Sequence, residues 1–333
     1  MSAPVLPRRP VVAGVVASGI VVCIVALLAA GGAPKPLPAG LHGASLPVSW
    51  AVPVLRLLAD GAAIVCGGAV LAAVLLLKPE GDGKLGAQGL KAVQDAAVAA
   101  GVWAVASIGG LVVTASVILG LPLSHLAEEA AAAGQLDQVR ALAVAVALTA
   151  VLAVVLSGCR TVRTARVSLV LIALAIAGPL LTGHGAIERT AFWSVLATAS
   201  LVMHVFAATA WIGGLGALIR YTRERTAIEY FSYLALVCAI TIGVTGLLTA
   251  EIHLGGREDG WGLITQWVTT GYGALVFAKA VAFAVLVAIG WRHRQATLPA
   301  LADRPALFYR LVAVELVVMA GTVGLAVALS RTP

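Results

Sequence analysis

The chain has 333 residues, of which 61% are hydrophobic and only 11% are charged. No soluble core needs so large an apolar fraction, so the composition indicates a protein that crosses the membrane lipid several times. Apolar runs of about 20 residues favour helices, because the strands of a membrane barrel alternate over about 10 residues. The net charge of +7 does not indicate a nucleic-acid partner, because the basic residues follow a membrane topology.

Nine apolar spans are predicted, and they form an all-α transmembrane bundle that we expect to be a single membrane domain over residues 1–333. Residues 1–31 are expected to hold an uncleaved first helix. Their basic start and small-residue end also resemble a secretory signal peptide, which is the alternative. The spans cover residues 11–31, 54–77, 97–120, 141–159, 167–183, 193–219, 231–252, 269–291 and 311–330.

The basic residues are divided unequally between the two sets of helix ends. Fifteen lie at one set and six at the other, with Lys279 left inside a span. The positive-inside rule therefore places the N-terminus in the cytoplasm and the C-terminus outside. The richer set is Arg8, Arg9, Lys78, Lys84, Lys91, Arg160, Arg163, Arg166, Arg220, Arg223, Arg225, Arg292, Arg294, Arg304 and Arg310.

His204 lies inside the sixth span, about 16 Å below its start at 1.5 Å per residue, which is near the middle of a bilayer. An ionisable side chain at this depth usually faces the bundle interior and marks a site. Trp211 continues the same helical face, and Gly213 and Gly214 then allow another helix to approach closely. His204 is either a metal ligand or a buried histidine that bonds a neighbouring hydroxyl.

Five of the six histidines lie in the membrane or at the predicted outer side, which suits a metal that arrives from outside. His184 follows Pro179 and is flanked by glycines, so its backbone can bend towards a ligand. His253 ends a line of threonines spaced by four residues. This line either forms a polar route to mid-membrane or only bonds the helix backbone. The threonines are Thr241, Thr245 and Thr249.

Two further outer histidines are candidates. His42 lies in a loop that contains glycine and proline and can fold over the outer mouth of the bundle. His125 precedes Glu128 and Glu129, and on a helix these spacings put all three on one face. They then form either an acidic collecting site for cations or a solvated loop surface.

Two sulfur side chains are candidate accessory ligands, with ordinary packing as the alternative for both. Met203 offers a thioether, which favours Cu(I), although adjacent helical residues point about 100° apart and Met203 cannot share the face of His204. Cys238 lies just inward of the threonine line.

Four charges within the spans need partners. Arg56 and Asp60 are four residues apart, so they can pair with one another. Lys279 is expected to extend inward towards Glu315. Both pairs have a structural or a gating role. His293, in the basic segment WRHR, is expected to be solvated. The sequence contains no nucleotide-binding or hydrolase signature, so we expect that the chain is not an enzyme.

The segment HVFAATAWIGGLGAL at 204–218 resembles the H-x3-A-x2-W-x-G-G-L signature of the copper resistance D family (CopD, PcoD). The likeness includes FSYLALVCAITIGVTGLLTA at 231–250, YGALVFAK at 272–279 and Glu315, and it is most specific over 193–330. The resemblance implies copper movement across the bacterial cytoplasmic membrane, usually inward, often with a periplasmic copper-binding partner of the CopC type.

The leading hypothesis is therefore copper transport or tolerance. Outer imidazoles of His184, His253 and His42 capture the ion, and His204 binds it at mid-depth. One alternative is a membrane electron carrier with a b-type haem, which needs two histidines at equal depth. Another is an assembly factor that delivers copper to an oxidase partner.

Overall fold

The structure is a computed structural model that describes residues 8–36, 43–182, 191–254, 262–297 and 305–332. Within these residues nine helices are long and apolar enough to cross a membrane, and no strand is present, which confirms the predicted helical class. The long helices are α1 Arg8–Ala29, α2 Leu46–Leu71, α3 Ala87–Leu119, α5 Asp137–Ser157, α6 Val162–Thr182, α7 Ala191–Tyr221, α8 Arg225–Leu254, α10 Gly271–Arg292 and α11 Pro305–Leu329.

Short elements complete the described chain. Two π-helices, Ala72–Leu76 and His293–Thr297, extend α2 and α10. The remaining elements are α4 Ala130–Ala133, α9 Gly262–Thr269 and the 3-10 turns Gly81–Gly83 and Leu123–His125. Several helices are longer than the apolar spans, since α3 begins at Ala87 and the predicted span begins at residue 97. The first turns of α3 are helical but contain polar residues, so the apolar run that defines the predicted span begins later.

Large apolar side chains cover the outside of the helices. Val98 and Val105 of α3 are each 70% exposed, and Val154 of α5 is 72% exposed. Water would penalise a continuous surface of this kind, whereas acyl chains accept it. The protein is therefore a multi-pass membrane protein.

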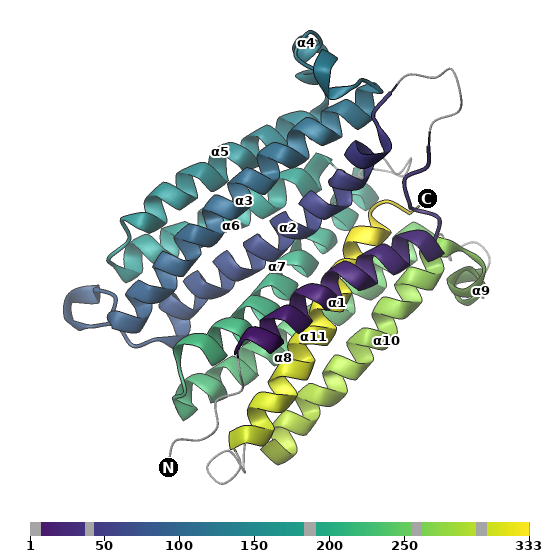
Figure 1. Ribbon diagram of the computed structural model, residues 1–333. Coiled ribbons are helices and arrows are strands. Elements are labelled where there is room, and N and C mark those ends of the chain that lie inside the picture. The colour runs from purple at the N-terminus through teal and green to yellow at the C-terminus, as the bar shows by residue number, and fades with distance from the viewer. Residues whose placement is uncertain (1–7, 37–42, 183–190, 255–261, 298–304, 333) are drawn as a thin grey trace. The chain divides into compact units, whose positions relative to one another are not determined.

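The chain divides into two compact units, and the boundary falls inside α8, between Thr249 and Ala250. The single membrane domain expected from the sequence stays a prediction. The unit of residues 34–249 holds α2, α3, α5, α6, α7 and most of α8. In it α2 packs against α3, α6 and α7, while α5, at the edge of the unit, packs against both α3 and α6 (Figure 1).

Glycines bring α2 and α7 into backbone contact. A Cβ atom added to Gly68 would collide with the backbone of Gly213, and one added to Gly213 would collide with the Ile64 carbonyl. Small residues allow such an approach, and in lipid the resulting van der Waals contact drives helix association. This contact fixes the part of α7 that lies inward of His204.

The second unit, residues 1–33 and 250–333, is built on α1 and α11. The two helices meet through small residues, and the Ser18 hydroxyl donates a 2.8 Å hydrogen bond to the Val317 carbonyl. A Cβ atom on Gly324 would collide with the Gly19 carbonyl, so the backbones are again in contact. Helix α10 packs beside α11.

Replacing Gly68 by alanine is expected to lower the free energy of unfolding by about 1 to 3 kcal/mol, because the added methyl group forces α2 and α7 apart. Thermal unfolding of the purified protein in detergent measures this. Gly61 in the same helix is the matched control, since a Cβ atom there has no heavy atom within 4 Å. Gly61→Ala should keep the wild-type stability, and equal stability of both variants would contradict the close contact.

Candidate functional site

His204 lies in the middle of α7 and faces α8. It is about 20 Å from the first residue of α7 at 1.5 Å per residue, which keeps it at mid-depth. The ring is partly buried, and its Nδ1 lies 3.0 Å from the Thr245 hydroxyl of α8. The two helices are consecutive and antiparallel, so residues far apart in sequence meet side by side across this hairpin.

Two more hydroxyls lie one turn farther towards the start of α7. The Ser200 hydroxyl donates a 3.1 Å hydrogen bond to the Thr245 carbonyl and is 3.3 Å from the Thr249 hydroxyl. Gly246 lies under the imidazole, because a Cβ atom there would be 3.5 Å from His204 Cε1. The ring therefore lies against the backbone of α8, within a group of hydroxyls.

Thr241 and Thr245 of the threonine line in α8 bond their own helix backbone, and Thr245 also contacts α7. Thr241 donates to the Val237 carbonyl of its own helix at 2.9 Å, as threonines in membrane helices often do. Thr245 donates to the Thr241 carbonyl at 2.6 Å and also contacts His204. Only the outer part of the line therefore takes part in the contact with α7.

The inner half of the hairpin is apolar. Trp211 is 4% exposed and Cys238 is 5% exposed. Cys238 precedes Thr245 by about 10 Å along α8, which is too far for its sulfur to share an ion with His204. Met203 is 52% exposed and is not part of this contact, as its place next to His204 in the helix predicts. The accessory role of either sulfur stays a prediction from the sequence.

The structure describes little of the histidines that are proposed to capture the ion. His42 and His184 lie outside the described residues, and His253 lies in the last turn of α8 with its side chain outside them. Among the side chains that the structure describes, no group of three or more His, Cys, Asp or Glu is arranged to hold a metal ion. The capture step remains a prediction from the sequence.

His125, Glu128 and Glu129 do not share one helical face in the structure. His125 ends an exposed 3-10 turn, where its Nδ1 lies 3.1 Å from the Ser124 hydroxyl. Glu128 and Glu129 lie in the turns that follow and are exposed. The segment folds as turns because Leu126 packs against the apolar cluster between α3 and α5, and no α-helix carries all three residues on one face.

Two of the four predicted charge partners pair as expected. Arg56 Nε lies 3.1 Å from the Asp60 carboxylate, across one turn of α2. Both side chains are more than a third exposed, so the pair contributes little to stability. The two residues are four apart on one helix, so the sequence alone predicts their contact.

The expected pair of Lys279 and Glu315 is not formed among the residues that the structure describes. Glu315 is 3% exposed and faces His293, whose Nε2 lies 3.3 Å from its Oε2. His293 lies about 21 Å beyond Lys279 along the same helix, a distance that a lysine side chain cannot span. The expectation that His293 is solvated is also wrong, because α10 continues as a π-helix and buries the ring against Phe308.

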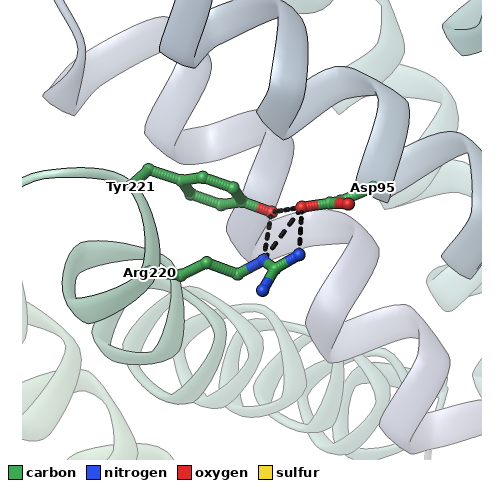
Figure 2. A network of polar contacts seen from close by, with 3 residues as sticks. All are labelled: Asp95, Arg220 and Tyr221. Atoms are coloured by element: carbon green, nitrogen blue, oxygen red, sulfur yellow. Dashed lines mark hydrogen bonds and ion pairs between the residues drawn. The ribbon is translucent and has the colours of Figure 1, made fainter. Parts of the chain in front are cut away.

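A polar network at the other end of α7 was not predicted. Three donors meet at Oδ2 of Asp95 in α3, as Figure 2 shows: the Tyr221 hydroxyl at 2.7 Å, Arg220 Nε at 2.9 Å and Arg220 Nη2 at 2.8 Å. The Arg220 guanidinium also lies 5.5 Å from the centre of the Tyr221 ring. The one signal in the sequence is an acidic residue two positions before the predicted span 97–120, near the basic Lys91.

The network joins α3 to α7 at the end that the positive-inside rule places in the cytoplasm. Tyr221 is buried, and Asp95 and Arg220 are partly exposed. Charge-assisted hydrogen bonds of this kind are stronger than neutral ones. With the glycine contact, they hold the inner half of α7 against its neighbours.

The comparison with known proteins concerns the C-terminal part of the chain. Residues 225–329 match CopD, copper resistance protein D. No curated protein and no solved structure matches the chain. The CopD match confirms the resemblance over α8, α9, α10 and α11, and it includes Thr245 and Glu315. His204 lies before the matched residues, so its assignment rests on the segment at 204–218 and on its contact with α8.

Replacing Asp95 by alanine is expected to lower the free energy of unfolding by about 1 to 2 kcal/mol, because Arg220 and Tyr221 lose a shared acceptor. This value is below that of a buried charged hydrogen bond, since Arg220 is partly solvated. Glu229→Ala is the control, because its ion pair with Arg225 is exposed and should cost at most about 0.5 kcal/mol. Thermal unfolding measures both variants, and Asp95→Ala should be less stable than Glu229→Ala.

Proposed function

We propose that the chain moves copper ions inward across the bacterial cytoplasmic membrane and so acts in copper tolerance or supply. The observation that carries the proposal is His204 at mid-depth, facing a row of hydroxyls contributed by α7 and α8. Imidazole binds copper, and an ionisable ring in a span indicates an ion path more often than a packing role. The CopD match supports copper as the cargo.

The ion enters from the outer side in this proposal. His42, His184 and His253 make first contact, with copper handed over by a periplasmic partner of the CopC type. The hydroxyls of Thr249 and Ser200 then line the approach to His204. Because Trp211 and Cys238 are buried below it, passage inward requires α7 and α8 to separate there.

His204→Ala is expected to reduce copper-dependent accumulation in cells to the level of cells that lack the protein, because the single imidazole at mid-depth is lost. Cellular copper measured by mass spectrometry reports the change, with the amount of membrane-inserted protein matched between strains. His125→Ala is the control, since this exposed residue lies in an outer turn. Unchanged accumulation in His204→Ala would remove the residue from the path.

Purified protein in liposomes should take up labelled copper without any other chain. Uptake above that of protein-free vesicles and of His204→Ala vesicles is the expected result. An assembly factor that only delivers copper to an oxidase would bind the ion without moving it into the lumen, so binding without uptake would favour that alternative. Nothing in the described residues supports the haem alternative, and a visible spectrum without a Soret band is expected.

A further inference from the structure

An aromatic ring lies between α7 and α8 at the inner end of their hairpin. Phe231 of α8 is 4% exposed, and its ring lies directly on Gly214 of α7. A Cβ atom added to Gly214 would be 2.6 Å from Cε2 of this ring, so the missing side chain is what makes room for it. Gly213, the preceding residue, is in backbone contact with α2, and this packing holds the glycine on which the ring is seated.

Phe231 belongs to the face of α8 that contacts α7. Phe231, Cys238 and Thr245 are spaced by seven residues, which is almost two helical turns, so the three share one face. The first contacts Gly214 and the third contacts His204, so this face is turned towards α7. Cys238 is 5% exposed and therefore lies in the same interface, between the His204 contact and the Phe231 ring.

The closed part of the hairpin is long. His204 is level with Thr245, and seven residues farther inward on each helix Trp211 is level with Cys238. The Phe231 ring comes 14 residues inward of Thr245, which is about 21 Å along the helix. This stretch of the interface is largely apolar, and apolar constrictions exclude water and ions. An ion at His204 therefore has no polar route to the inner end while the ring stays in place.

We propose that the Phe231 ring, seated on Gly214, is the inner gate of the hairpin. It closes the inner side of the His204 site, and it has to leave its seat before an ion can pass inward. The gate role rests on the proposed function. The seal itself does not, because it follows from contacts within the protein.

Access to the Cys238 thiol tests the seal without copper. The full chain carries Cys23→Ala, Cys66→Ala and Cys159→Ala, which leaves Cys238 as its single cysteine. A charged thiol reagent that cannot cross the membrane is added to inverted membrane vesicles, and the labelling of Cys238 is followed by mass spectrometry. The thiolate is the nucleophile, and a thiol buried in apolar surroundings is inert, so this background chain should be labelled slowly.

Phe231→Ala is expected to raise the rate of labelling from the inner face severalfold, because water reaches Cys238 once the ring is gone. Gly214→Ala should also raise the rate, since the added methyl group displaces the ring from its seat. Gly216→Ala is the matched control, because a Cβ atom there has no heavy atom within 4 Å, and it should be labelled like the background chain.

Three results would overturn the seal. These are labelling of Phe231→Ala at the background rate, fast labelling of the background chain from the inner face, and equal rates in Gly214→Ala and Gly216→Ala. If Phe231→Ala does not reach the membrane, the comparison of the two glycine variants decides.

Labelled copper in liposomes tests the gate role. Copper should cross the vesicle membrane faster through Phe231→Ala than through the wild-type protein, and His204→Ala in the same chain should abolish this gain. Faster thiol labelling without faster copper movement would contradict the gate role. Failure of the wild-type protein to move copper, with the expected labelling pattern, would instead contradict the proposed function and leave the seal in place.

Discussion

The contact between the His204 imidazole and the Thr245 hydroxyl is the interaction on which the polar interior of this bundle depends. A bilayer offers no water to a ring at this depth, so its partner has to come from another helix. The contact joins α7 to α8, and Ser200 repeats the link one turn away. The outer half of the α7–α8 hairpin is therefore lined by hydroxyls, and its inner half is apolar, with Trp211 and Cys238 buried there.

Features that depend on local sequence could be predicted. The nine spans follow from the length of the apolar runs, and the Arg56–Asp60 pair follows from a spacing of four residues. The depth of His204 follows from counting residues along one helix. None of these predictions requires the relative positions of two helices.

Features that depend on the alignment of two helices could not be predicted. Thr245 was recognised only as one of a line of threonines, because choosing it as the partner of His204 requires the relative positions of α7 and α8. Asp95 lies far from Arg220 in sequence and meets it only through the packing of α3 on α7. His293 was misjudged because a span defined by hydropathy ends before the π-helix that carries this residue.

The glycine contact between α2 and α7 has a mechanical consequence. Where two backbones touch without side chains between them, neither helix can slide or roll without losing the contact. Hydroxyl hydrogen bonds, by contrast, can be exchanged for others when a helix shifts. The α2–α7 contact is thus held by backbone packing, whereas the outer half of the α7–α8 hairpin is joined by hydroxyl hydrogen bonds whose partners can change.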